Sequence, residues 1–289
     1  MTLAKLSTKL RAYWTMTKSL QTALLLVTGV AGYSSARCPV TTWQTVLALV
    51  ASLFLVISGS TVLNMVYDKD IDAKMKRTCW RPLPVRLVAP AEALLLGIAL
   101  SCIGLAGARA MAPFYALVVF AGLFFDVAIY TIWLKRRTAY SIIIGGLAGG
   151  MPVLAGRALA TGRVDGIGVL LALAVLLWIP THIMTFSIRY AEEYALAGVP
   201  TFPSTYGVQT TRVLISLASV GAAGAVMLAG LLIGMSWGYL GFLGVLGVGL
   251  LALAIANVMR PSPKLNFGLF KYASLYMLCS MLLVVAGAV

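Results

Sequence analysis

Long apolar stretches, broken by short polar or charged segments, run along almost the whole chain. Each approaches the roughly 20 residues that an α-helix needs to cross the hydrocarbon core of a bilayer. The pattern predicts an all-α integral membrane protein with about nine transmembrane helices. The predicted spans are 19–36, 43–67, 91–108, 112–134, 141–160, 166–188, 211–234, 236–257 and 268–288.

The segments outside this count do not suggest a second domain, so residues 1–289 are interpreted as one polytopic membrane domain. Residues 1–18 are basic and amphipathic and lack a cleavage-site pattern, which is typical of an interfacial helix rather than a removed signal. The glycine-rich runs at 142–150 and 238–249 are interpreted as packing faces, since small residues let helices approach closely in lipid.

Composition supports the membrane interpretation. Hydrophobic residues make up 61% of the chain and charged residues only 10%, which excludes an ordinary soluble domain. The net charge of +14 then indicates basic loops and attraction to anionic lipid, not nucleic acid. Cys38, Cys79, Cys102 and Cys279 have no metal-ligand spacing and are interpreted as unpaired thiols.

Basic residues predict the orientation. Of the 22 lysines and arginines, all but Arg37, Arg109, Arg157 and Arg163 lie in the N-terminal arm or at the connections that follow even-numbered spans. The positive-inside rule therefore predicts a cytoplasmic N-terminus and, with nine spans, a C-terminus outside. Arg157, near the outer end of its span, is expected to snorkel to the interface.

A cluster of acids in the cytoplasmic connection 68–90 is the first candidate for chemistry. Asn64, Asp68 and Asp72 are spaced four residues apart, so a continuing helix would place them on one face. Three stacked oxygen ligands suit Mg²⁺, which completes its coordination with substrate phosphate. A solvated, salt-bridged loop is the alternative for any charge run.

Charged neighbours complete this segment. Asp70 is out of phase and is expected to pair with Lys74 or Lys76. The basic side chains that follow are suited to diphosphate oxygens. The candidate diphosphate ligands here are Lys74, Arg77 and Arg81.

Two further charged segments are predicted on the same side. Glu192 and Glu193, in the connection 189–210, are a second candidate metal site that could face the first. Lys135 and Arg136 close the fourth span and are either further diphosphate ligands or an anchor of the positive-inside kind.

Three runs of residues carry a resemblance to a known family. They are NMVYDKDIDAKMKRTCWRPL, then YTIWLKRRT with the following IIGGLAGGMPVLAGRALATG, and WIPTHIMTFSIRYAEEYALAGVPTFP. They resemble the UbiA superfamily of intramembrane prenyltransferases and, within it, the heme O synthase (protoheme IX farnesyltransferase) branch. The similarity extends from about Tyr13 to Gly207, and the last three spans match only as hydrophobic segments.

This resemblance implies a helical bundle around a central cavity, two acidic motifs on cytoplasmic loops, Mg²⁺ and a prenyl diphosphate. By position, Asn64, Asp68 and Asp72 match the first metal motif. Glu193 stands where the family usually has Asp before Tyr, and Lys18 is followed by Ser-Leu where Pro-Arg is common.

Four residues are candidates for contact with the acceptor. His182, the only histidine, matches the family's Pro-His element, and imidazole is a common ligand of heme iron. A satisfied structural histidine is the alternative. Asp126, ionisable within a span, either orients the acceptor, pairs with a cation, moves a proton or is a protonated structural group. The other two acceptor candidates are Tyr130 and Arg189.

The expected activity is Mg²⁺-dependent transfer of a prenyl group, farnesyl by resemblance, from its diphosphate to the vinyl group of heme B, giving heme O. Heme is then a substrate and not a cofactor. The expected setting is a prokaryotic cell membrane with the site on the cytoplasmic side, and a heme A synthase or terminal oxidase assembly as partner. Alternatives are a UbiA-type enzyme with a quinone-precursor or glycerol phosphate acceptor, and, more remotely, a cation-coupled transporter.

Overall fold

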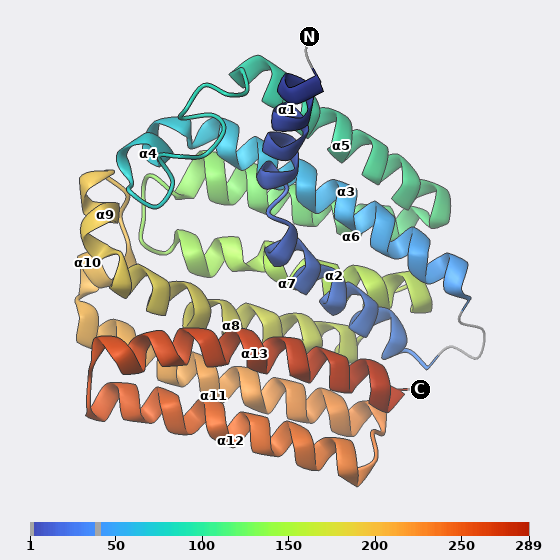
Figure 1. Ribbon diagram of the computed structural model, residues 1–289. Coiled ribbons are helices and arrows are strands. Elements are labelled where there is room, and N and C mark those ends of the chain that lie inside the picture. The colour runs from blue at the N-terminus through green and yellow to red at the C-terminus, as the bar shows by residue number, and fades with distance from the viewer. Residues whose placement is uncertain (1–2, 38–41, 289) are drawn as a thin grey trace.

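The computed structural model describes residues 3–37 and 42–288, apart from the side chains of residues 3–6, 19 and 20. Helices account for nearly all of it (Figure 1). In chain order the elements are α1 (Leu3–Met16), α2 (Ser19–Ser34), α3 (Trp43–Tyr67), α4 (Lys69–Lys74), α5 (Pro90–Met111), α6 (Pro113–Phe124), the π-helix η1 (Phe125–Leu134), α7 (Ser141–Thr161), α8 (Gly166–Arg189), α9 (Ala191–Leu196), α10 (Phe202–Tyr206), α11 (Val208–Ile233), α12 (Trp237–Met259) and α13 (Pro263–Ala288).

The predicted all-helical membrane class is confirmed. Within the described residues, 8 helices are long and apolar enough to cross a bilayer, with α6 and η1 counting together as one. The remaining predicted span is α2, whose 16 residues make it shorter than the others. It nevertheless packs inside the bundle against α7, α3 and α13. The prediction of about nine membrane helices therefore differs from the structure only at this short element.

The long helices form two groups with α2 and α7 between them (Figure 1). On one side α3, α5 and α6 pack together, and on the other α8, α11, α12 and α13 do. The central pair is in backbone contact: a Cβ at Gly156 would lie 1.9 Å from the Gly29 carbonyl oxygen, and one at Gly32 would lie 1.9 Å from the Val153 carbonyl oxygen. Only glycine permits this approach.

The glycine-rich runs serve packing unequally. In the run at 142–150, a Cβ at Gly150 would lie 2.9 Å from the Ala172 carbonyl oxygen of α8, so this stretch of α7 is a packing face as predicted. In α12, a Cβ at Gly249 would lie 2.2 Å from the Tyr272 hydroxyl, but one at Gly241 would meet nothing within 4 Å. The prediction holds for α7 and only for part of α12.

Arg157 does not snorkel; the expectation is wrong. Its side chain is only 7% exposed and forms a two-pronged ion pair with Asp165, at 2.6 and 2.7 Å. It also donates to the carbonyl and hydroxyl oxygens of Ser35, at 2.8 and 2.9 Å. The guanidinium lowers the pKa of the Asp165 carboxyl, which caps the N-terminus of α8. Arg157 thus ties together the ends of α2, α7 and α8.

The cysteine prediction holds for the described residues. Cys79, Cys102 and Cys279 are free thiols. Cys38 lies outside the described residues.

Both acidic segments lie at one end of the bundle. The short helices α4, α9 and α10 gather there, at the left of Figure 1, where α8 ends and α13 begins. They close this end of the bundle and position the charged residues described next.

Candidate active site

Asp68 marks the joint between a membrane helix and the first acidic segment. α3 ends at Tyr67, Asp68 departs from helical geometry (φ −91°, ψ 7°), and α4 begins directly after it. The helical hydrogen bonds continue across the joint, from Asp68 N to the Asn64 carbonyl at 2.9 Å and from Asp72 N to the Asp68 carbonyl at 2.8 Å. Asp68 and Asp72 are each 5% exposed, whereas Asp70 is exposed. The predicted phase of this segment is therefore present.

The two buried carboxylates are paired with two predicted diphosphate ligands. Lys135 forms an ion pair with Asp68 Oδ2, and Arg81 donates two hydrogen bonds to Asp72, at 2.9 and 2.8 Å. Burial lowers the pKa of Lys135, but the Tyr130 oxygen and the Asp68 carboxylate outweigh it, so the pKa is raised. Lys135 therefore stays a cation at neutral pH. The structure brings these acids and cations, 67 and 9 residues apart in sequence, into one cluster.

Asp70 pairs with a different residue from the one expected. It accepts hydrogen bonds of 2.8 and 2.7 Å from Arg136, not from Lys74 or Lys76. These bonds lower the pKa of Asp70. Arg136 also donates to the Tyr67 carbonyl at 2.8 Å. Because Asp70 is out of phase with its buried neighbours, it holds Arg136 on the outer surface.

The second acidic segment packs directly on the first. Ile71 and Met75 of the first segment form a small buried cluster with Ala197 and Val199 of the second. A one-residue change of register in either segment would expose these apolar side chains, so the contact fixes how the two acidic segments face each other.

Arg77 connects the two segments. Its backbone N–H donates to Glu193 Oε2 at 3.3 Å, and its guanidinium donates to the Tyr194 hydroxyl at 3.1 Å. The guanidinium also lies 4.9 Å from the Phe186 ring centroid. Glu192, in contrast, is exposed, as is Lys74 at the end of α4. Of the predicted glutamate pair, Glu193 is the one that faces the first segment.

The donor set was tested for a fit to Mg²⁺. Among the described residues, no three His, Cys, Asp or Glu side chains already converge as a metal cluster. However, Asp68 Oδ1 is buried and has no hydrogen-bond partner. A buried carboxylate oxygen without a partner is costly, and a cation would satisfy it. Oxygen donors of the right kind are present, so the residues fit the ion.

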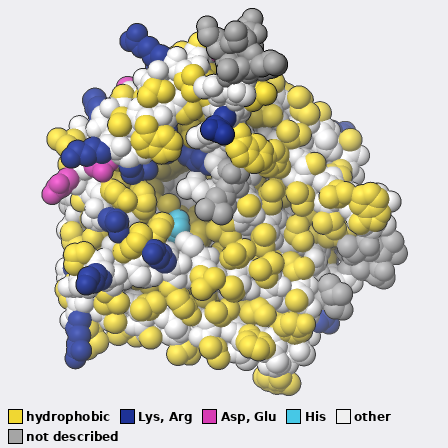
Figure 2. Space-filling view, in the orientation of Figure 1, with side chains coloured by type: hydrophobic (Ala, Val, Ile, Leu, Met, Phe, Trp, Pro, Cys, Tyr) yellow, Lys and Arg dark blue, Asp and Glu magenta, His cyan; other side chains and the backbone are white. Residues whose placement is uncertain are grey.

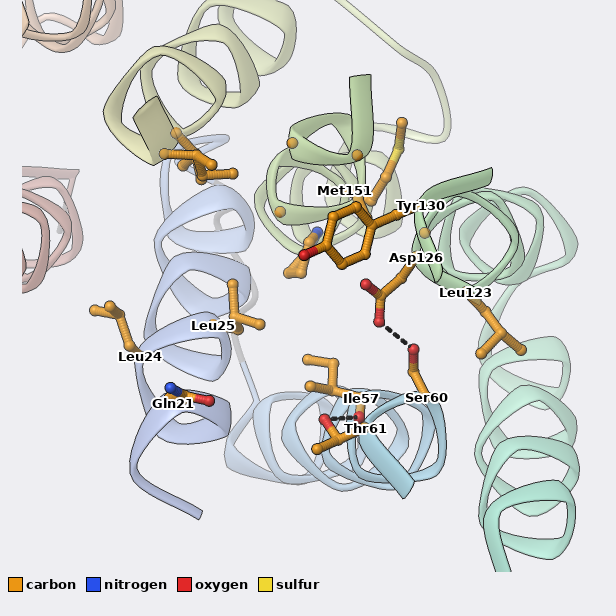
Figure 3. A pocket seen from close by; sticks show the side chains of 18 of the residues that line it. Gln21, Leu24, Leu25, Ile57, Ser60, Thr61, Leu123, Asp126, Tyr130 and Met151 are labelled. Atoms are coloured by element: carbon orange, nitrogen blue, oxygen red, sulfur yellow. Dashed lines mark hydrogen bonds between the residues drawn. The ribbon is translucent and has the colours of Figure 1, made fainter. Parts of the chain in front are cut away.

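A central cavity of about 370 Å³ opens beside this cluster. It lies between α2, α3, η1, α7 and α8, and most of its lining is apolar, as in many small-molecule sites. Figure 3 shows Tyr130 and Asp126 reaching into it from η1 and Ser60 from α3. Its polar lining consists of Lys18, Gln21, Ser60, Thr61, Asn64, Asp126, Tyr130 and His182.

A hydrogen-bond network links α3 to η1 at the cavity wall. Asp126 Oδ2 accepts from the Ser60 hydroxyl and, at 2.9 Å, from the Asn64 amide (Figure 3 shows the Ser60 bond). Thr131 donates to Asn64 Oδ1 at 2.7 Å. Asp126 is therefore paired with neutral donors, and of the earlier alternatives the structure favours an orienting role over pairing with a cation.

The π-helical geometry of η1 makes this network possible. Lys135 N bonds the Tyr130 carbonyl at 2.8 Å, five residues back, and the Thr131 hydroxyl bonds the Asp126 carbonyl at 2.9 Å, also five back. The wider turn places Asp126 and Tyr130 on the cavity side together. π-Helices are rare and occur often at functional sites. A regular helix had been expected over this span.

Lys18 is a cavity residue that the sequence analysis did not single out. It lies between α1 and α2 in a left-handed conformation (φ 46°, ψ 53°), which is uncommon for a non-glycine residue. Burial first, then repulsion from Arg81 and Lys135, lowers its pKa to about 8, while Asp126 and Asp72 offset part of the shift. The turn thus aims an ammonium group at the acid–base cluster.

His182 lies at the opposite wall of the cavity. Its ring stacks with Trp178 (centroids 4.8 Å apart) and Phe270 (4.5 Å apart). Its Nδ1 lies 3.1 Å from the Ser274 hydroxyl. Among the described residues only Ser274 bonds the imidazole, so Nε2 is left for a ligand in the cavity. In Figure 2 the cyan atoms of this single histidine are visible from outside the bundle.

Arg189 is the one acceptor candidate that lies away from the central cavity. Its guanidinium is 3.9 Å from the Phe267 ring centroid, and it lines a separate cavity at the end of α8. The sequence placed it correctly at the end of the span but could not show which side of the helix it occupies.

Comparison with known proteins agrees with this geometry. The UbiA prenyltransferase family matches residues 25–279. The chain belongs to this family. It is thus a membrane-embedded prenyltransferase, which removes the transporter alternative.

Individual relatives refine the comparison. A protoheme IX farnesyltransferase from Archaeoglobus fulgidus is 43% identical over 201 residues, which is 70% of this chain and 70% of the relative. A digeranylgeranylglyceryl phosphate synthase structure superposes with a TM-score of 0.80 at 20% identity, covering 97% of this chain and 99% of that one. A UbiA homolog from Archaeoglobus fulgidus bound to GPP and Mg²⁺ superposes with a TM-score of 0.69 at 16% identity, covering 95% and 99%.

Proposed function

We propose that this prenyltransferase transfers a farnesyl group from farnesyl diphosphate to heme B, giving heme O. The observation that carries the proposal is the position of the acid–base cluster: paired acids and cations stand beside a largely apolar cavity whose far wall presents a histidine. The names of curated relatives in the family support the donor and acceptor.

Mg²⁺ is proposed as the required ion. Asn64, Asp68, Asp72 and Glu193 would hold it, with Glu192 at the margin, and the buried unpartnered Asp68 oxygen supports this assignment. The UbiA homolog from Archaeoglobus fulgidus bound to GPP and Mg²⁺ supports the choice of metal. When bound, the ion supplies positive charge to the departing diphosphate.

The cations of the cluster are proposed to bind the diphosphate oxygens. Lys135 and Arg81 are now paired with Asp68 and Asp72, and Arg77 lies between the two acidic segments. An arriving diphosphate would exchange these ion pairs for phosphate contacts without bringing a new charge into an unprepared site. Lys74 and Arg136, which are exposed, are more distant candidates for the same role.

The remaining cavity is proposed to hold the isoprenoid chain away from water. The bond between the allylic carbon and the diphosphate oxygen breaks, and the exposed allylic carbon is attacked by the heme vinyl group. Water then adds the hydroxyl group of the product. The apolar walls restrict premature capture by water, and Tyr130, which projects from η1, presents a π face to the developing positive charge.

His182 is proposed to contact the heme. Its Nδ1 is engaged by Ser274, an arrangement that fixes ring orientation in many metal-ligating histidines, so Nε2 would face the iron. Asp126 would orient Asn64 and the nearby acceptor edge. A glycerol phosphate acceptor is the second candidate, because the fold of a digeranylgeranylglyceryl phosphate synthase superposes on nearly the whole chain.

The setting follows from the charges. The acid segments lie at the end of the bundle that is rich in lysine and arginine, which supports a cytoplasmic site and a cytoplasmic N-terminus. We propose that residues 1–289 act as one catalytic unit in a prokaryotic cell membrane. A heme A synthase or terminal oxidase assembly would take up the product.

The test is direct. The purified protein is incubated with Mg²⁺, heme B and farnesyl diphosphate, and the heme fraction is analysed by mass spectrometry. A heme mass raised by a farnesyl group plus water supports the proposal. Diphosphate release with a glycerol phosphate acceptor but not with heme would replace heme by the second acceptor.

A further inference from the structure

A second cavity of about 450 Å³ lies at the end of the bundle, apart from the central one. It is enclosed by the last turn of α8, the first turns of α11 and α13, and the connection that follows α12. Three cations line it, and none of its lining residues is acidic: Arg189, Arg212 and Lys264. Three positive charges converging without a counter-charge favour an anionic ligand.

Two buried polar atoms at this cavity have no hydrogen-bond partner in the described structure: Arg212 Nε and Asn266 Oδ1. Asn266 is 3% exposed, and its amide nitrogen donates to the Thr185 carbonyl at 2.8 Å. That bond fixes the amide orientation, so its oxygen remains a free acceptor. The cavity therefore offers one unused buried donor and one unused buried acceptor.

The cationic groups are held by the fold. The Arg189 guanidinium lies over the Phe267 ring at 3.9 Å, a contact that limits its freedom. Lys264 belongs to the first turn of α13, a helix of 26 residues whose N-terminus adds partial positive charge. The site is thus organised before any ligand arrives.

We propose that this cavity binds the headgroup of an anionic phospholipid that carries free hydroxyls, such as phosphatidylglycerol. The phosphate would accept from Arg212, Arg189 and Lys264, and a glycerol hydroxyl would donate to Asn266 Oδ1. A lipid is favoured over free phosphate because the cavity sits where membrane helices end and its wall also contains Ile188 and Pro263. Basic pockets between membrane helices bind anionic headgroups in this way. The site is independent of the proposed donor and acceptor.

The experiment uses the full chain in detergent, with native mass spectrometry of retained phosphatidylglycerol and phosphatidylcholine. Wild type is expected to retain one phosphatidylglycerol in preference to phosphatidylcholine. Arg212→Gln and Lys264→Gln are each expected to reduce that retention about tenfold, the loss of one charge-assisted contact. Arg137→Gln, an exposed cation outside the cavity, is the matched control and should retain lipid as wild type does.

Folding is checked separately, because Arg212 is largely buried. Phosphatidylglycerol should raise the melting temperature of wild type and of Arg137→Gln but not of Lys264→Gln, whose side chain is exposed. Equal retention and equal thermal shifts in all variants would overturn the proposal. Stabilisation by inorganic phosphate equal to that by phosphatidylglycerol, lost in the same variants, would also overturn it and leave a free-phosphate site instead.

Discussion

Asn64 donates a hydrogen bond of 2.9 Å to the Asp126 carboxylate, although the two residues lie 62 positions apart on different helices. The same Asn64 accepts from Thr131 through its other amide atom, at 2.7 Å. Its side chain is therefore oriented by both partners before any substrate binds. The pair connects the metal motif on α3 with the π-helical wall of the central cavity.

This coupling predicts non-additive variants. Asn64→Ala and Asp126→Ala are each expected to lower kcat/KM for prenyl transfer about 10- to 100-fold, since hydrogen bonds to charged groups contribute about 1.5–3 kcal/mol. The double variant should be no worse than the poorer single one, and a double-mutant cycle in kcat/KM measures this. Additive losses would show that the two residues act separately. Ser58→Ala, which removes a buried α3 hydroxyl without a partner, is the control.

Asp68 and Asp70 provide a matched pair for the metal assignment. Asp68→Asn should lower transfer at least about 100-fold, because it removes the charge of a buried carboxylate that has one unpartnered oxygen. Asp70→Asn makes the same chemical change two residues away, at an exposed side chain paired with Arg136, and should stay within about threefold of wild type. Turnover is measured across a Mg²⁺ titration, with melting temperatures as a folding check. Equal losses in both variants would contradict the assignment.

Local patterns in the sequence were sufficient for much of this arrangement. Helical spacing alone placed Asp68 and Asp72 on one buried face and Asp70 outside it, because intrahelical hydrogen bonds persist through the joint. Hydrophobic length gave the membrane helices, and it was least secure for α2, whose apolar stretch continues past the helix end at Ser34.

Other features depend on contacts between distant segments and could not be read locally. Arg136 pairs with Asp70 across 66 residues, and Arg157 reaches Ser35 across 122. The π-helix at 125–134 satisfies its carbonyls through Thr131 and through Asn64 on another helix, whereas the apolar pattern there suits a regular helix. Lys18 gave a signal only as the lysine that this chain shares with its family.

Lys18 predicts a pH dependence. Its pKa is lowered to about 8, so the free enzyme loses this cation as pH rises through 8 rather than near 10.5. If the ammonium binds diphosphate, kcat/KM for the donor should be constant below pH 8 and fall above it, while kcat at saturating donor changes less. Lys18→Arg should remove the decline, because guanidinium stays charged throughout. An identical alkaline decline in Lys18→Arg would assign it to another group.

Gly145 predicts a steric effect on the cavity wall. A Cβ there would lie 2.5 Å from Cδ2 of the Tyr130 ring, closer than such contacts allow, so Gly145→Ala must displace that ring or η1. We expect a loss of about 1–3 kcal/mol in stability together with reduced transfer. Gly241→Ala on α12, where a Cβ meets nothing within 4 Å, should leave both unchanged. Thermal melting and turnover of the two variants make the comparison, and equal melting temperatures would show that η1 adjusts freely.

The Ser274–His182 contact gives a prediction that separates binding from chemistry. If His182 Nε2 ligates heme iron, His182→Ala should change the optical spectrum of bound heme and weaken its binding. Ser274→Ala should shift the spectrum less and weaken heme binding about 10-fold, since it removes the partner that orients Nδ1. Ser216→Ala removes a serine hydrogen bond of similar length, 3.0 Å to the Ala254 carbonyl between α11 and α12, and should alter neither property. An unchanged spectrum in His182→Ala, with transfer retained, would assign His182 to packing between Trp178 and Phe270; normal transfer to heme in that variant would still leave the prenyltransferase assignment intact, because the diphosphate cluster lies across the cavity from this histidine.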